Sequence, residues 1–124
     1  MAVEDTEFGN LIGSDKVEGT AVYGADGESI GSIERVMLDK KSGKASYAVL
    51  SFGGFPGMGA DHYPIEWNAL KYNPELGGYQ IGLTAKQLEG APRYSKEEEW
   101  DWNDPARFRT VDTYYNSLGI PPGI

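Results

Sequence analysis

Between residues 16 and 82 the sequence is a series of short apolar runs separated by turn residues, and this pattern constrains the fold more than any other feature. β-Branched and aromatic residues fill the runs, while Gly, Asp and Pro separate them. The Asp26-Gly27 dipeptide and the segment 40–43, which ends in Gly43, are typical of tight turns between antiparallel strands. The pattern therefore predicts a mainly β domain built from hairpins.

Six strands are expected, at 19–23, 30–39, 44–52, 62–67, 70–72 and 79–81. The run 44–52 is the longest and is apolar on both faces, which predicts a central, covered strand. Within 30–39 the apolar residues change face between Ile33 and Val36, which predicts a bulge. We expect an antiparallel barrel over residues 17–82, with seven residues in or beside its core: Val22, Ile33, Val36, Leu38, Val49, Leu50 and Trp67.

Helix signals appear only after the last predicted strand. Thr84 and Gln87 have the spacing of a capping box, and Asp104-Pro105 is typical of an N-cap followed by proline in the first turn. Four apolar residues then repeat at helical spacing and define one face: Phe108, Val111, Tyr115 and Leu118. The expected organisation is a flexible acidic arm (1–16), a β domain (17–92) and a helical, aromatic C-terminal extension (93–124).

The net charge of −8 is unevenly distributed. Residues 1–18 hold five acids against one lysine, a net of −4, while residues 19–92 hold eight acids against six bases, a net of −2. No basic stripe is present, which argues against nucleic-acid binding. The N-terminus lacks the pattern of a signal peptide and no apolar run could span a bilayer, so we expect a cytoplasmic protein without membrane insertion. The absence of cysteine excludes disulfides and thiolate chemistry.

The segment 51–67, SFGGFPGMGADHYPIEW, contains four glycines that could suggest a phosphate-binding loop: Gly53, Gly54, Gly57 and Gly59. A nucleotide loop, however, needs either Lys-Ser/Thr after the last glycine or a third spaced glycine, and it opens a helix. Here an acid, Asp61, follows and the next segment is a predicted strand. The glycines are therefore interpreted as structural, forming a wide turn between two strands.

The same residues resemble a known family, the PRC-barrel domain. The resemblance covers about residues 17–92 and rests on Gly19, Val22, Gly27, Ile30-Gly31, Ile33, Leu38-Asp39, Gly43, Tyr47-Ala48-Val49, Phe52-Gly53-Gly54, Gly57, Gly59, Tyr63-Pro64, Trp67 and Leu70. This family is named for the cytoplasmic domain of the photosynthetic reaction-centre H subunit, and it includes stand-alone bacterial proteins. The tail looks like the extension of short alphaproteobacterial members. One departure is Glu66, where relatives usually have proline.

The resemblance implies a small bent β-barrel and no catalytic constellation. From the residues themselves, His62 with Asp61 and Glu66 could be considered as metal ligands, but in a strand the Cα atoms of His62 and Glu66 lie about 13 Å apart. A triad with Ser51 lacks an oxyanion-hole signature. The acids 97–99 point in different directions on a helix and are interpreted as solvated. We therefore expect no catalytic residues, no cofactor and no metal.

Two classes of function remain. The first is a non-enzymatic interaction or adaptor module that docks on a protein partner or a membrane-associated assembly, as the family's reaction-centre member does. The second is a small-molecule-binding domain that uses the barrel mouth. A homodimer is also expected, through an open barrel edge or through the face of Phe108, Val111, Tyr115 and Leu118. The competing expectation is that the tail caps its own barrel.

Overall fold

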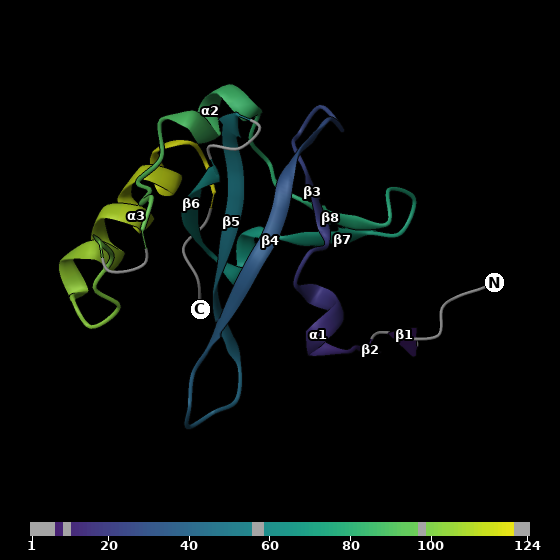
Figure 1. Ribbon diagram of the computed structural model, residues 1–124, viewed down its shortest axis with the longest axis horizontal. Helices are drawn as coiled ribbons and strands as arrows, with labels where there is room; N and C mark the ends of the chain where they lie inside the picture. The colour runs from purple at the N-terminus through teal and green to yellow at the C-terminus, as the bar shows by residue number, and fades with distance from the viewer. Residues whose placement is uncertain (1–6, 9–10, 56–58, 97–98, 121–124) are drawn as a thin grey trace.

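The computed structural model describes residues 7–8, 11–55, 59–96 and 99–120. Within these ranges the β-strands are β1 (Glu7–Phe8), β2 (Leu11–Ile12), β3 (Ala21–Tyr23), β4 (Ser29–Leu38), β5 (Ala45–Phe55), β6 (Gly59–Glu66), β7 (Lys71–Asn73) and β8 (Gly78–Gln80). The helices are α1 (Ser14–Val17), the 3-10 helix η1 (Trp67–Ala69), α2 (Ala85–Glu89) and α3 (Pro105–Ser117). Figure 1 shows a curved sheet with α3 on the side of β6 and α1 on the side of β4.

Strands β3 to β8 form one six-stranded sheet in the order β6-β5-β4-β3-β8-β7. The predicted hairpins are confirmed: β4 pairs with β5, β5 pairs with β6, and all three run antiparallel. The register of β4 shifts between Ile33 and Arg35, at the predicted bulge. Gly43, in the turn between β4 and β5, has a φ of 77°, a left-handed conformation that favours glycine.

The expected fold class, a mainly β domain of six strands with a short C-terminal helix, is confirmed, and two details of the sheet differ from a closed antiparallel barrel. Strand β3 pairs with β8 in parallel, with Val22 opposite Tyr79. In addition the sheet is open, because within the described residues no ladder joins β6 to β7. The parallel pairing is possible because β8 follows a long excursion of the chain through β4 to β7, so its direction is not set by a hairpin with β3.

The core lies on the inner side of the curved sheet and continues under the tail. Four of the seven predicted core residues are buried (Val22, Ile33, Val49 and Leu50), and two others, Val36 and Trp67, are partly buried against the cluster. Leu38 was wrongly predicted, because its side chain is 58% exposed. It pairs with Ala45 beyond a register shift, where the β4–β5 hairpin extends past the body of the sheet.

The C-terminal extension folds onto the sheet. The capping box at Thr84 is confirmed, and the side chain of Asp104 caps α3 by accepting a hydrogen bond from the Ala106 N–H at 2.9 Å. Ahead of α3, His62 and Tyr94 exchange two backbone hydrogen bonds of 2.9 and 3.0 Å, which attach the extension to the edge of β6. The extension therefore continues the sheet and covers part of its edge.

The described part of the N-terminal segment contains two short strands and a helix, and the flexible arm expected over residues 1–16 stays a prediction. Strands β1 and β2 pair with each other, and α1 follows directly. Helix α1 is held by the buried side chain of Val17, and Gly19 N–H donates to the carbonyl of Ile33 on β4 at 2.7 Å.

Candidate interaction surface

The β4–β5 hairpin ends in a projection that we call the finger, residues 38–45. Figure 1 shows it extending below the sheet, away from the other elements. Its turn is closed by backbone hydrogen bonds between Asp39 N–H and the Lys44 carbonyl (2.8 Å) and between Gly43 N–H and the Asp39 carbonyl (2.9 Å). The finger is thus an ordered turn held by its own hydrogen bonds.

The finger is basic in an otherwise acidic protein. It carries three lysines and one acid (Asp39, Lys40, Lys41, Lys44), a net charge of +2. The Asp39 carboxylate accepts hydrogen bonds from the backbone N–H groups of Ser42 and Lys41, each 2.9 Å long, which hold the pKa of Asp39 below its usual value. The Asp39 carboxylate therefore stabilises the turn through these hydrogen bonds, while the lysine side chains are exposed.

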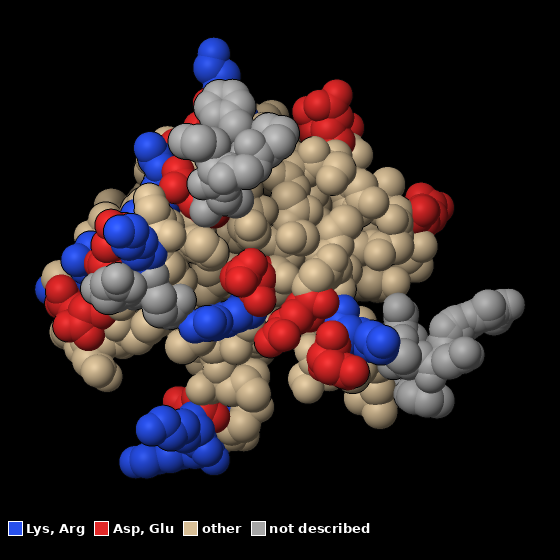
Figure 2. Space-filling view, viewed as in Figure 1, with Lys and Arg blue, Asp and Glu red and all other residues tan. Residues whose placement is uncertain are grey.

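An apolar groove lies between the finger and α1, at the mouth of the curved sheet. This mouth groove has a volume of about 340 Å³. Figure 2 shows the hollow below the body of the molecule, beside the projecting finger with its blue lysines. The apolar residues that line it are Ile12, Val17, Val36, Leu38, Ala45 and Trp67. Leu11, next to Ile12 in β2, is 70% exposed, so an apolar surface extends beyond the groove.

The wall opposite the finger is acidic. It consists of α1 with the residue that follows it, and residues 14–18 hold two acids and one lysine (Asp15, Glu18, Lys16), a net charge of −1. Glu18 lines the groove itself. The mouth groove therefore has an apolar floor between a basic wall and an acidic wall.

The glycine segment joins two paired strands. Gly53 has a φ of 86°, and Phe55 pairs with Gly59 across the hairpin. Gly54 lies in β5 and Gly59 opens β6, whereas Gly57 lies outside the described residues. The left-handed backbone at Gly53 supports the structural interpretation at that position.

The residues weighed for metal chemistry are engaged in other contacts. Asp61 forms an ion pair with Arg93, with 3.2 Å between its Oδ2 and the arginine Nε. The ring of His62 stacks on Tyr94 with 5.2 Å between centroids. Over the described ranges, no group of three or more His, Cys, Asp or Glu side chains is arranged to hold a metal ion.

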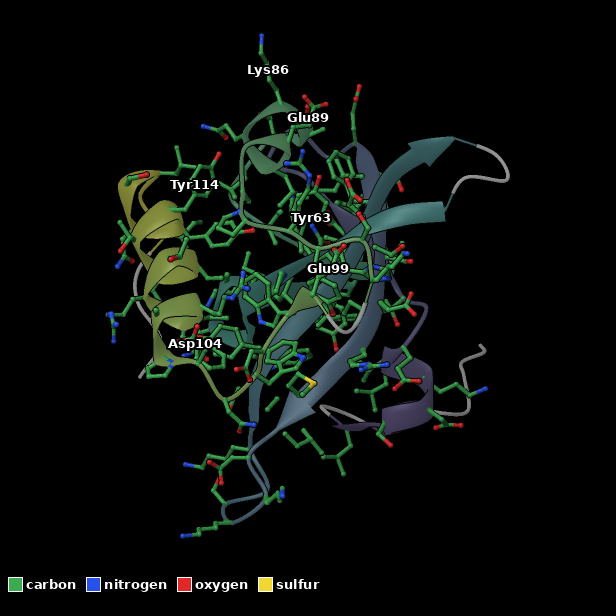
Figure 3. The ribbon with its side chains drawn as sticks, turned by 60° about the vertical axis from the view of Figure 1, so that its left-hand side comes forward. Tyr63, Lys86, Glu89, Glu99, Asp104 and Tyr114 are labelled. Carbon is green, nitrogen blue, oxygen red and sulfur yellow. The ribbon has the colours of Figure 1, made fainter. Side chains whose placement is uncertain are left out.

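The four residues predicted as a dimer interface face the sheet of their own chain. Val111 and Tyr115 are 0% and 3% exposed, and Phe108 and Leu118 are partly buried. In Figure 3, α3 stands beside the sheet with Asp104 at its start and Tyr114 near its end, and Tyr63 lies between the helix and the strands. The alternative expectation, a tail that caps its own barrel, describes this arrangement. The dimer remains a prediction, and the other surface expected for it is the open edge of the sheet.

A larger and more open depression, of about 880 Å³, lies between α3 and residues 90–92. Three of its four hydroxyl groups already donate within the chain: Thr110 to the Ala106 carbonyl, Ser117 to the Tyr114 carbonyl, and Tyr114 to the Gln87 carbonyl. These donors are not free to select a ligand. The mouth groove, with its exposed leucines and charged walls, is the stronger candidate.

Sequence reasoning missed the mouth groove because it placed Leu38 in the core. The signal was present in the charged residues 39–41, which follow Leu38 directly. A leucine one residue before a run of charged turn residues lies at a hairpin end, where the sheet no longer covers it.

The fold is thus a small mainly β domain with a helical tail docked on its sheet. The model of the PRC-barrel domain family matches residues 9–88, more than half of the chain. The protein therefore belongs to the PRC-barrel domain family. A comparison with curated proteins gave no match. None of the helices in the described ranges is long and apolar enough to cross a membrane.

Proposed function

We propose that the protein is a non-enzymatic interaction module that docks on another protein through the mouth groove. The single observation that carries this proposal is the exposure of Leu38, at 58%, on the edge of a groove with an apolar floor. Contiguous apolar surface that is rimmed by charged groups is typical of protein interaction sites. The partner is a protein, either free or part of a membrane-associated assembly.

A capture experiment with a matched control tests this function. The immobilised full-length chain and its Leu38→Glu variant are compared in native cell extract, and Tyr72→Glu serves as the control. Tyr72 is also exposed, at 42%, but lies on β7 and does not line the groove.

A charge placed in the centre of an apolar interface is expected to reduce capture of a stoichiometric partner on the order of tenfold or more. Tyr72→Glu should leave the recovery of that partner unchanged. Equal recovery with all three proteins would contradict a docking role for the groove.

The size of the groove favours one second candidate, a small-molecule-binding domain. Its volume of about 340 Å³ falls within the range of ligand pockets, roughly 300–1,000 Å³. Native mass spectrometry of the purified protein distinguishes the two candidates. A retained small molecule that Leu38→Glu releases would support this second function, and a bare chain mass would count against it.

A further inference from the structure

The mouth groove has the charge pattern of a surface that can pair with itself. One wall is the finger, with a net charge of +2, and the other is the α1 wall of residues 14–18, with a net charge of −1. Between them lies the apolar floor that includes Val36 and Trp67. A two-fold axis through such a groove brings the basic wall of one copy against the acidic wall of the other.

We infer that the protein docked at the mouth groove is a second copy of this chain, held by packing of each finger against the α1 wall of the other copy. This inference rests on the proposed function and names its partner. The apolar floor of each copy, with Leu38 at its edge, faces the floor of the other, and the exposed Lys40, Lys41 and Lys44 of each finger lie beside Asp15 and Glu18 in the α1 wall of the other copy.

Several observations favour this occupant over an unrelated protein. Leu38 is 58% exposed and Leu11 is 70% exposed, so apolar surface remains uncovered on both sides of the groove in the single chain. The finger projects from the body, which allows it to reach a neighbouring molecule (Figure 1). It also brings lysines to a protein with a net charge of −8, whose other copies offer acidic surface.

The expected dimer is small in contact area and sensitive to salt. One finger and one groove per copy bury less than a standard interface, about 800 Å² per partner, so dissociation is expected at micromolar concentrations. Ion pairs at the rim are screened as ionic strength rises. The dimer should therefore weaken between about 0.05 and 0.5 M salt.

Reciprocal charge reversal tests the geometry. The finger variant carries Lys40→Glu, Lys41→Glu and Lys44→Glu, which changes the net charge of the finger from +2 to −4, since each substitution removes one positive charge and adds one negative charge. The wall variant carries Asp15→Lys and Glu18→Lys, which changes the α1 wall from −1 to +3. All five side chains are exposed, so both variants should fold, and thermal unfolding checks this.

Sedimentation equilibrium is measured from about 1 to 500 µM for each protein and for the mixture of the two variants. The wild-type mass should rise towards twice the 13.5 kDa of the chain, and each variant alone should stay at the mass of the monomer. The mixture should dimerise, because the acidic finger then meets the basic wall, and the basic finger meets the acidic wall. A third variant, with Lys71→Glu, Lys86→Glu and Lys96→Glu, is the control. It lowers the net charge by the same amount as the finger variant, but at positions away from the groove, and it should dimerise like the wild type.

A wild-type mass of 13.5 kDa at every concentration would overturn the inference, and so would a mixture that stays monomeric. If the chain is monomeric but Leu38→Glu still abolishes capture of a different protein, the inference fails while the proposed function stands. If Leu38→Glu changes neither the mass nor the capture of any protein, both fail.

Discussion

Glycine serves two different physical needs in this sheet. At Gly31, a Cβ atom would lie 2.2 Å from the carbonyl oxygen of Ser51, so the missing side chain lets β4 approach β5 closely. At Gly53, a Cβ atom would meet nothing within 4 Å, but the φ of 86° disfavours an L-residue. At Gly53 the requirement for glycine arises from backbone conformation alone. A substitution there therefore measures the cost of the left-handed conformation without steric clashes.

We predict that Gly53→Ala lowers the free energy of unfolding by about 1–2 kcal/mol, the cost of a left-handed conformation for an L-residue. Asparagine tolerates this conformation better, so Gly53→Asn should cost less. Urea denaturation of the three proteins checks both statements. Equal costs for Ala and Asn, or no cost for Ala, would show that the backbone at residue 53 is not the reason for glycine.

At the scale of elements, α3 and the sheet share one core. Val111 and Tyr115 belong to the same buried cluster as the residues of β3 to β6. The hydroxyl of Tyr47 on β5 also donates to the Asp112 carboxylate of α3 at 3.2 Å. An element attached by both apolar and polar contacts is expected to unfold together with the sheet.

We predict that Val111→Ala lowers the free energy of unfolding by about 2 kcal/mol, because it removes two fully buried methyl groups. Thr113→Ala, at an exposed position on the same helix, is the control and should change stability by less than about 0.5 kcal/mol. Tryptophan fluorescence and far-UV circular dichroism should report one coincident transition. Two separate transitions would show that α3 unfolds independently of the sheet.

The features that could be predicted from the sequence depend on neighbouring residues, whereas those that could not be predicted join distant segments. The capping box at Thr84, the Asp104-Pro105 start of α3 and the turn at Gly43 were all predicted, because each depends on residues within one turn. The parallel pairing of β3 with β8 was not predictable, since the two strands are far apart in the sequence and the local pattern of one does not indicate which strand it pairs with. The mouth groove was missed because Leu38 was misplaced, and because the β4–β5 hairpin, residues 12–18 and Trp67, which line the groove together, lie far apart in the sequence.

At the scale of the whole molecule, buried tyrosines link stability to alkaline pH. Burial raises the pKa of Tyr63 and of Tyr115, and burial together with the nearby carboxylates of Asp112 and Glu66 raises the pKa of Tyr47. The folded pKa of each group lies above the unfolded value of about 10. The folded state thus keeps protons that the unfolded state releases, so stability is present below pH 10 and is lost as pH rises above it.

We predict that the free energy of unfolding falls steadily above about pH 10, and that Tyr115→Phe reduces the slope by roughly 1.4 kcal/mol per pH unit, the contribution of one proton. Urea denaturation at several values from pH 8 to 11 measures both slopes. The variant is compared with the wild type at each pH, so that contributions from lysines cancel. An unchanged slope would show that the Tyr115 hydroxyl ionises equally in both states.

The parallel pairing of β3 with β8 has a consequence for the order in which the chain folds. The meander of β4, β5 and β6 joins neighbours in sequence, so its loops close at small entropic cost. Pairing Val22 with Tyr79, 57 residues apart, requires a far longer loop to close. The meander is therefore expected to form first and the β3–β8 ladder last, and during synthesis β3 leaves the ribosome long before its neighbour β8 exists. Until β8 is synthesised, the backbone groups on one edge of β3 have no partner strand. During that period this edge can pair with a strand of another chain.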